Sequence, residues 1–296
     1  MQVDCLIVGG GIAGLQAAIQ LGRYCRRVTV VDAAEGRSTM CRSYHNIIGW
    51  PDGVSGPELL ASGREQAKRL GVQFVYGKAA AAAREEGGFT VTLEDSSRIS
   101  AKRLLLATGV KDRLPPFPAL LPCLGVSVYV CPDCDGYEVW KKRTVVLGAG
   151  NTGASMALAL THWTSELTYV NHEQSEVEES VRRSLDQKGI VYIETSVREV
   201  LAEQSQLSGF ILDDGTRLEA RHAFVALGGN QVRSGLAEQL GARLMDNRHI
   251  VVDPRTKMTS VPHVWAAGDV TAHSEMSTIA MGDGSQAAIW INKSLL

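Results

Sequence analysis

The hydrophobic positions at the start of the chain follow a β-α-β pattern. Val3–Val8 is a short apolar run typical of a buried strand, and Ile12–Leu21 has apolar residues at helical spacing. Val28–Val31 is a second apolar run, and it stops at the acidic residue Asp32. The first thirty residues therefore predict a strand, a helix and a second strand.

The same pattern returns in the middle of the chain. Thr144 opens an apolar run, a helix is expected to about Trp163, and Leu167–Val170 predicts the next strand. Each copy is followed by a hairpin with a polar turn and then by a strand that stops at glycine. This repeated plan predicts an α/β fold of two Rossmann-like, three-layer ββα dinucleotide-binding domains. The hairpins and strands in matching register are Leu93–Ala101 with Leu106–Gly109, and Leu212–Ala220 with Val225–Gly228.

The last part of the chain has no counterpart in the second copy, so we assign it to the first domain. The second domain is then an insertion, and the Pro-rich stretch Leu114–Pro118 marks the crossing into it. The predicted boundaries are 1–112 with 242–296 for the first domain and 113–241 for the second. The elements expected after Gly229 are a short helix near Leu236, strands at Ile250–Val252 and from Val264 to Gly268-Asp269, and a helix from Thr278 to Leu295.

Composition and charge exclude several classes of protein. The 296 residues include 30 basic and 32 acidic side chains, and this balance argues against a nucleic-acid binder. Six cysteines are too few for a disulfide scaffold of this length. The apolar start carries Asp4, four glycines and Gln16, which fits neither a signal peptide nor a membrane span. We therefore expect a cytoplasmic protein that begins directly in a folded domain and does not bind membranes.

The first copy carries a glycine-rich turn between its strand and its helix. Gly9, Gly11 and Gly14 fit G-x-G-x-x-G, and Asp32 follows at the end of the second strand. The first glycine permits a tight turn, the second lets the backbone approach a pyrophosphate, and the third allows close packing of the helix. Asp32 is placed to accept hydrogen bonds from an adenosine ribose. The residues expected to bind this dinucleotide are Gly9, Gly11, Ile12, Ala13, Gly14 and Asp32.

The second copy has the same glycines but different partners. Asp32 lies 23 residues after Gly9, and the same step from Gly148 reaches Asn171, with Glu173 close behind. An NADPH site favours arginine here, to pair with the 2′-phosphate, which Glu173 would repel. This disfavours NADPH and leaves NADH, a second flavin or a vestigial copy of the fold as alternatives. The residues expected at this second site are Gly148, Gly150, Asn151, Thr152, Gly153, Asn171 and Glu173.

The chemistry is best located at Cys131-Pro132-Asp133-Cys134. A C-x-x-C is either a redox pair or half of a zinc site. The sequence has no second C-x-x-C, and Cys123 is the only nearby extra thiol, so we favour the redox pair and expect no metal. Asp135 is placed to move a proton to or from a thiolate. Because a dithiol on two dinucleotide domains needs a two-electron carrier, flavin is the obvious cofactor.

With these motifs, essentially the whole chain resembles the low-molecular-weight thioredoxin reductase family of flavoproteins. Cys131–Gly136 resembles the family's C-x-x-C-D-G, Ala107-Thr108-Gly109 its A-T-G strand end, and Gly268-Asp269 its G-D motif. The resemblance implies that FAD binds the first glycine turn, with Asp269 near the ribityl-phosphate region. The other residues that it places at FAD are Asn46, near the isoalloxazine, Ala107, Thr108, Gly109, Gly268, Ser277 and Thr278.

The resemblance also implies roles and partners. Cys134 would face the flavin, Cys131 would exchange with the substrate, and Asp135 would donate the proton. The family is homodimeric, and its two domains rotate so that the dithiol alternates between flavin and substrate. The implied substrate is a thioredoxin-like protein or a small disulfide.

Two departures from the family concern the electron donor. The family's basic H-R-R motif is Asn171-His172-Glu173 here, and its Arg-Gln pair beside the flavin is Met276-Ser277. The C-P-D-C sequence also resembles a branch that includes flavin-dependent dithiol oxidases. A ferredoxin or a second flavin is therefore an alternative donor to NADPH.

Three functions compete at this point. The leading one is an FAD-dependent disulfide reductase acting through Cys131–Cys134. The second is a dithiol oxidase that runs the same chain backwards and passes electrons to oxygen. The third, from a different class, is a non-catalytic flavin-binding redox sensor, for which an intact C-x-x-C-D-G would be superfluous.

Overall fold

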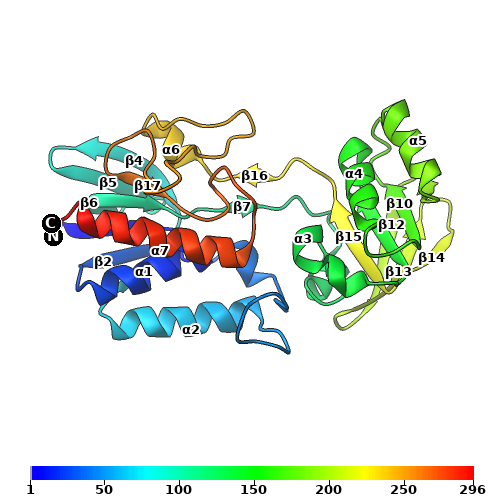
Figure 1. The fold of residues 1–296 in the computed structure, drawn as a ribbon, viewed down its shortest axis with the longest axis horizontal. Helices are drawn as coiled ribbons and strands as arrows, with labels where there is room; N and C mark the ends of the chain where they lie inside the picture. The colour runs from blue at the N-terminus through cyan, green and yellow to red at the C-terminus, as the bar shows by residue number, and fades with distance from the viewer. Residues whose placement is uncertain (1) are drawn as a thin grey trace. The chain divides into compact units, whose positions relative to one another are not determined.

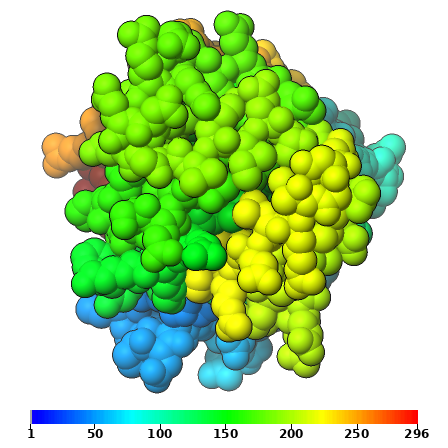
Figure 2. Space-filling view, turned by 90° about the vertical axis from the view of Figure 1, so that its right-hand side faces the viewer, coloured from blue at the N-terminus to red at the C-terminus, as the bar shows by residue number. Residues whose placement is uncertain are grey.

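The structure is a computed structural model that describes residues 2–296, and it divides the chain into two compact units (Figure 1). Unit 1 comprises the chain up to Thr39, Gly56–Lys111 and Gln231–Leu296. Unit 2 comprises Met40–Ser55 and Asp112–Asn230. Both units are built on a parallel sheet, so the predicted α/β fold of two Rossmann-like domains is confirmed. Figure 2 shows a face of unit 2, where the chain runs from green to yellow.

Unit 1 is a sheet in the order β3-β2-β1-β6-β5-β4 with helices packed against it. Its parallel pairs join β1 (Val3–Val8), β2 (Val28–Asp32), β3 (Gln73–Tyr76), β6 (Arg98–Leu106) and β17 (Val264–Ala266). The strand β5 (Gly88–Leu93) pairs antiparallel with β6, and β4 (Ala79–Glu85) pairs antiparallel with β5. Its helices are α1 (Ile12–Arg23), α2 (Gly56–Arg69), α6 (Gly235–Gln239) and α7 (Ser277–Lys293), with a 3-10 turn η1 (Arg37–Thr39).

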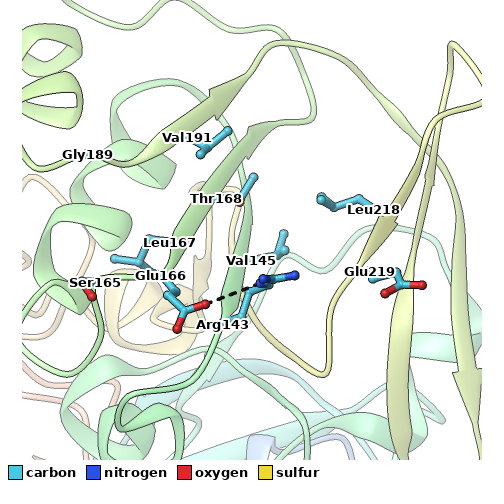
Figure 3. Close-up of a pocket in the computed structure, with 10 residues that line it drawn as sticks. All are labelled: Arg143, Val145, Ser165, Glu166, Leu167, Thr168, Gly189, Val191, Leu218 and Glu219. Carbon is cyan, nitrogen blue, oxygen red and sulfur yellow. Dashed lines mark ion pairs between the residues drawn. The ribbon is translucent and has the colours of Figure 1, made fainter.

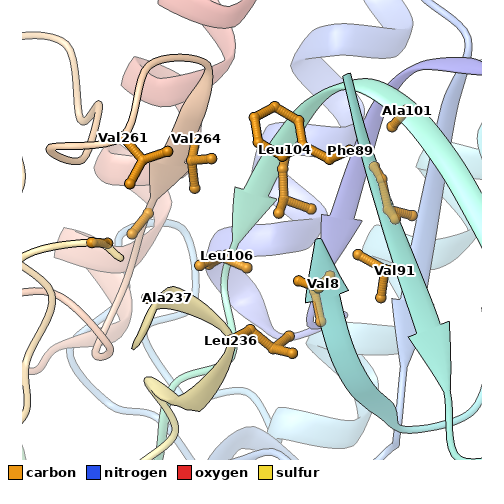
Figure 4. Packing of buried hydrophobic residues seen from close by; sticks show 14 of the residues in the cluster. Val8, Phe89, Val91, Ala101, Leu104, Leu106, Leu236, Ala237, Val261 and Val264 are labelled. Carbon is orange, nitrogen blue, oxygen red and sulfur yellow. The ribbon is translucent and has the colours of Figure 1, made fainter. Parts of the chain in front are cut away.

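The long strand β6 joins two layers of unit 1. Its first half pairs with β5, Phe89 opposite Ala101, and its second half pairs with β17, Val264 opposite Leu104. The predicted hairpin strand and returning strand are therefore one continuous strand in this copy. The apolar core lies between the meander and the sheet, where side chains such as Phe89, Leu104 and Val264 interdigitate (Figure 4). Fully burying a side chain of this size stabilises a fold by about 1.5–3 kcal/mol.

Unit 2 repeats the plan with a five-stranded parallel sheet in the order β11-β10-β9-β15-β8. The strands are β8 (Val128–Tyr129), β9 (Thr144–Gly148), β10 (Leu167–Asn171), β11 (Val191–Ile193) and β15 (His222–Ala226). A meander of β12 (Val197–Glu203), β13 (Gln206–Leu212) and β14 (Arg217–Glu219) forms the second layer. The helices are α3 (Pro132–Asp135), α4 (Gly150–Leu160) and α5 (Glu179–Gln187), with 3-10 turns η2 (Pro118–Cys123) and η3 (Gly136–Val139).

The chain crosses between the units at the two-stranded pair β7 (Val110–Lys111) and β16 (Gln231–Val232). The return to unit 1 comes at Gln231, eleven residues before the predicted boundary at 242. The reason is that Leu236 and Ala237 of α6 bury their side chains in the unit 1 core. A second difference is the segment Met40–Ser55, which packs with unit 2, for example through the hydrogen bond from Arg42 N–H to Leu124 C=O.

The expected strand at Ile250–Val252 is wrong. Ile250 and Val252 form isolated bridges, to Leu244 and Thr271 and to Thr259, because this buried segment passes between loops rather than along a strand. The helix expected to about Trp163 ends at Leu160, and the last helix spans Ser277–Lys293. Among the helices of residues 2–296, none is long and apolar enough to cross a bilayer.

Candidate functional site

The first glycine turn brings the end of β1 against the end of β6. Gly9 has φ +111°, and a Cβ there would lie 2.1 Å from the carbonyl oxygen of Ala107. At Gly14 a Cβ would lie 1.9 Å from the Gly9 oxygen, so the helix packs directly on the turn. Gly11 differs from both, because a Cβ there would meet nothing within 4 Å. Gly9 and Gly14 thus shape the turn, and Gly11 leaves open space beside it.

The open side of Gly11 is also the positive end of α1. Gly11 is the N-cap residue of α1, and it has no side chain that could accept hydrogen bonds from the first-turn N–H groups, beginning with those of Ile12 and Ala13. The first turn of a helix has N–H groups without partners inside the helix, and these attract anions. The turn therefore presents backbone N–H donors to the open space next to Gly11. A methyl group at this position would begin to fill that space.

Asp32 ends β2 next to this turn and is almost fully buried. Its Oδ1 accepts hydrogen bonds from the N–H groups of Gly10, at 3.3 Å, and Ala34, at 3.1 Å. Its Oδ2 is ion-paired with Arg64 of α2 at 2.7 Å. A Cβ on Gly10 would lie 2.5 Å from Asp32 Oδ2, so the middle glycine is needed to admit this carboxylate. The sequence interpretation missed Arg64, which is distant in the chain and carries no local signal.

The motifs from later in the chain complete one cradle in unit 1. Thr108 Oγ1 donates to the Arg233 oxygen at 2.6 Å, and Gly109 has φ +67°. After β17, Asp269 Oδ2 accepts from Arg37 at 2.9 Å, and burial raises the pKa of Asp269 although Arg37 opposes this. Ser277 and Thr278 form the first turn of α7, whose N-cap Met276 makes no side-chain cap.

A buried acid on α7, which the sequence interpretation also missed, fixes the Gly268-Asp269 turn. Asp283 accepts hydrogen bonds from Gly268 N–H, at 3.1 Å, and from His273, and it is ion-paired with Lys257 at 2.8 Å. Burial acts to raise the pKa of Asp283, but His273 and Lys257 outweigh it and lower this pKa. The signal available in the sequence was Asp283 as the one acid of this helix.

These unit 1 groups fit FAD. The open space at Gly11, the uncapped starts of α1 and α7 and the carboxylate of Asp32 are what a pyrophosphate and a ribose require. Asn46, predicted near the isoalloxazine, lies in the segment Met40–Ser55, which the structure groups with unit 2 rather than with this cradle.

The second glycine turn has the same letters but a different environment. A Cβ at Gly148 would lie 2.5 Å from Gly153 Cα, and one at Gly153 would lie 2.5 Å from the Tyr169 ring, so both glycines serve packing. Gly150 has φ +50°, and its Cβ would lie 2.9 Å from the Glu176 carbonyl oxygen. The side of the turn that is open at Gly11 is therefore faced by the chain itself at Gly150.

The covering segment is held by side chains predicted to bind a nucleotide. Asn151 and Glu178 exchange two hydrogen bonds, Nδ2 to Oε1 at 2.8 Å and Glu178 N–H to Oδ1 at 2.9 Å. Asn171 is fully buried; it accepts from Gly150 N–H at 3.0 Å and donates to the Ser175 oxygen at 2.7 Å. Asn171 thus spends its polar atoms on the fold.

The remaining residues of this second turn are also engaged within unit 2. Glu173 is ion-paired with Arg113, which also donates to the Leu227 oxygen. The hydroxyl of Thr152 lies beside Gly228, where a Cβ would come within 3.0 Å of it. A hollow elsewhere in unit 2 is lined by Arg143 and Glu166, paired at 3.6 Å, and by the starts of β9, β10 and β11 (Figure 3). Because the glycine turn follows the other end of β9, this hollow is not part of it.

The C-x-x-C motif opens the short helix α3. Cys131 is its N-cap residue, and its Sγ accepts a hydrogen bond from the Cys134 N–H at 3.3 Å. Both cysteines are free thiols and half-buried. The Trp163 ring packs against Gly136, where a Cβ would come within 2.6 Å, which explains the glycine after Asp135. Cys123 is buried in the apolar core of unit 2.

The two thiols differ in acidity. Hydrogen bonds from the thiol and the N–H of Cys134 lower the pKa of Cys131, although burial opposes this. The pKa of Cys134 is raised, because its thiol donates to Cys131 and because it is buried. Burial, and then the charge of Glu138, raise the pKa of Asp135 to about 7. The site therefore holds one thiol poised as the nucleophile and an acid that titrates near neutrality.

Comparisons with known proteins agree with this architecture. The family profile of the pyridine nucleotide-disulphide oxidoreductases matches residues 3–284. The alkyl hydroperoxide reductase (F subunit) of Xanthomonas campestris pv. phaseoli is 30% identical over 299 residues; the match covers 97% of this chain and 56% of that protein, so this chain spans about half of it. Thioredoxin reductase of Coxiella burnetii is 29% identical over 305 residues, covering 96% and 93%.

Among solved structures, thioredoxin reductase from Streptococcus pyogenes superposes with a TM-score of 0.88 at 25% identity, covering 99% of this chain and 98% of that one. The likeness spans both units and both glycine turns. The chain therefore belongs to the pyridine nucleotide-disulphide oxidoreductase family.

Proposed function

We propose that this enzyme is an FAD-dependent thiol–disulfide oxidoreductase that works through the Cys131–Cys134 pair with an electron donor other than NADPH. The observation that carries the proposal is the asymmetric dithiol, with Cys131 hydrogen-bonded at a helix N-cap and Asp135 beside it. The unit 1 cradle, with Gly11, Asp32 and Asp269, would hold FAD. When bound, FAD would supply the two-electron carrier that the side chains lack.

The exchange with a substrate disulfide uses this chain's own groups. The Cys131 thiolate attacks one sulfur, the substrate S–S bond breaks, and the released thiolate takes the proton of Asp135. The Asp135 carboxylate then removes the proton of Cys134, and Cys134 attacks the Cys131 sulfur. The second substrate thiolate leaves, the dithiol has become a disulfide, and two electrons have passed to the substrate.

The second glycine turn supports a donor other than NADPH. A 2′-phosphate would need a free cation near Glu173, but the Arg113 guanidinium there is already paired with Glu173, and the Glu176 backbone faces Gly150. A ferredoxin or a second flavin is then the donor to test, beside NADH. The basic run that an acidic ferredoxin would contact is Lys141, Lys142 and Arg143, shortly after the dithiol in the sequence. Two of these side chains already have partners, since Lys142 donates to the Glu138 oxygen and Arg143 pairs with Glu166.

The poor fit of the second glycine turn to NADPH also favours a second candidate function. This is a dithiol oxidase that passes electrons from a substrate dithiol to oxygen without nicotinamide. The thioredoxin reductase relatives instead suggest a thioredoxin-like protein as the disulfide substrate. The homodimer that the family resemblance implies is part of the same proposal. A non-catalytic redox sensor would show no turnover with either a disulfide or a dithiol.

An anaerobic titration of the flavin spectrum tests the proposal. We expect one flavin per chain, bleached by dithionite and not by NADPH; bleaching by NADPH would overturn the proposed donor. Dithionite-reduced enzyme should reduce a thioredoxin or a small disulfide, and Cys131→Ser should abolish this, whereas Cys25→Ser, at an exposed thiol in unit 1, should not. Oxygen uptake with dithiothreitol alone would instead favour the oxidase.

A further inference from the structure

Glu138 lies one turn beyond the dithiol acid Asp135, in η3. Its Oε1 is 3.4 Å from Nδ1 of His45, and about a quarter of the Glu138 side chain and a third of the His45 side chain are exposed. His45 comes from the segment Met40–Ser55, which belongs to the same unit. Glu138, the second acid near the dithiol, is therefore paired with a histidine that is partly exposed to solvent.

The turn around His45 is built to hold this ring. Its other nitrogen, Nε2, is 3.0 Å from the Ser43 hydroxyl. Gly53 has φ +83°, and a Cβ there would lie 2.4 Å from Ser43 Oγ and 3.0 Å from the His45 ring. Tyr44 and Val54 pair through two backbone hydrogen bonds, N–H to oxygen at 2.8 and 3.1 Å, and close the hairpin. The position of His45 against Glu138 is thus specified by the segment, not left to a free loop.

The groups electrostatically coupled to Asp135 are otherwise acids, thiols and a phenol. The charge of Asp135 acts to raise the pKa of Cys131 at the N-cap of α3, of Cys134 within it, of Tyr129 in β8 and of Cys41, and Asp133 lies in the same short helix. The neighbouring helix α4 contributes no charged residue, and the cation beside Glu138 is Lys142, whose Nζ donates to the Glu138 backbone oxygen at 2.7 Å. Besides burial, the charge of Glu138 raises the pKa of the Asp135 carboxyl.

We propose that Glu138, held by His45, is a positioning residue whose negative charge, one turn from Asp135, favours the protonated carboxyl and so keeps a proton donor beside the dithiol. The inference rests on the proposed function, in which Asp135 gives its proton to the first leaving thiolate. The negative charge of Glu138 disfavours a second carboxylate nearby. Removing the charge of Glu138 must therefore favour ionised Asp135.

The test is the pH dependence of Cys131 alkylation by iodoacetamide in the dithionite-reduced, FAD-loaded full chain, followed by mass spectrometry. Ionised Asp135 disfavours the thiolate form of Cys131. The plot of alkylation rate against pH for the wild type should therefore contain an inflection near pH 7, and Asp135→Asn should remove it. We expect Glu138→Gln to lower this inflection by about half to one pH unit. Glu138→Asp, which keeps the charge, should retain the wild-type position.

Glu166→Gln is the matched control, because Glu166 pairs with Arg143 and is not among the charges that shift the pKa of Asp135, so it should not move the inflection. An inflection unchanged in Glu138→Gln would overturn the inference, and so would one that persists in Asp135→Asn. Under the proposed function, dithiothreitol should reduce the flavin through the dithiol and bleach it. If it does not, the result counts against the proposed function alone, because the alkylation profile does not depend on electron transfer to the flavin.

Discussion

The difference between Gly9 and Gly11 leads to the sharpest prediction for the FAD cradle. Gly11 has φ −75°, a conformation open to any residue, and a Cβ there would meet nothing within 4 Å. Alanine should therefore fit the chain without FAD. Because alanine is a poorer N-cap than glycine, we expect Gly11→Ala to change the free energy of unfolding of the apoprotein by no more than about 1 kcal/mol.

The same methyl group should weaken FAD binding strongly. It would occupy the open space at the uncapped start of α1, where the pyrophosphate must approach the backbone. We expect the Kd for FAD to rise at least about tenfold, which corresponds to ~1.4 kcal/mol. The measurement is the quenching of flavin fluorescence on titration of FAD with apoprotein, beside urea denaturation of the same sample.

Gly9→Ala is the matched control within one turn. Its Cβ would lie 2.1 Å from the Ala107 oxygen, and its φ of +111° strains any side chain. Strain and overpacking each cost about 1–3 kcal/mol, so this variant should lose several kcal/mol of stability whether or not FAD is present. The reasoning would be refuted if Gly11→Ala bound FAD with the wild-type Kd, or if it destabilised the apoprotein as much as Gly9→Ala.

Two further predictions concern the dithiol and acid stability. Cys134→Ser should trap a mixed disulfide between Cys131 and the substrate, visible as added mass that dithiothreitol removes; a variant that never accumulates it would contradict Cys131 as the attacking thiol. Burial acts to raise the pKa of Asp4, but Arg27 and Lys102 outweigh it and lower this pKa to about 2. Its stabilisation is therefore present above about pH 4 and lost as the pH falls towards 2. Asp4→Asn should cost about 1 kcal/mol at pH 7 by urea denaturation, and an equal cost at pH 2.5 would contradict this assignment.

The β-α-β cores were predictable because their signals are local. Val3–Val8 and Val28–Val31 are mainly apolar runs that stop at glycine or at an acid, and the structure has strands β1 (Val3–Val8) and β2 (Val28–Asp32) there. Ile250–Val252 failed on the same signal, since an apolar run reports burial and not the presence of a neighbouring strand. Ala79–Glu85 shows the reverse, because five alanines favour a helix by propensity and yet form strand β4 against β5.

The site was predictable only as far as motifs reach. The motif placed both thiols and the acid close together, because Cys131, at the N-cap of α3, and Cys134 and Asp135, within α3, share one helical turn. Arg64 beside Asp32, and His45 beside Glu138, come from segments that are far away in the sequence, and no spacing rule links them. Their pairing is decided by tertiary packing, which is also what sets the charge of Asp135.

The two glycine turns separate what a motif reports from what it does not. Gly11 and Gly150 occupy the same place in G-x-G-x-x-G, and both allow a close approach to the backbone. At Gly11 the approach is open to a ligand, whereas at Gly150 the Glu176 backbone makes it. The exchange of hydrogen bonds between Asn151 and Glu178 that holds this segment uses residue types that also bind nucleotides. A glycine motif therefore predicts proximity, and only the identity of the approaching group decides between a cofactor site and a packed turn.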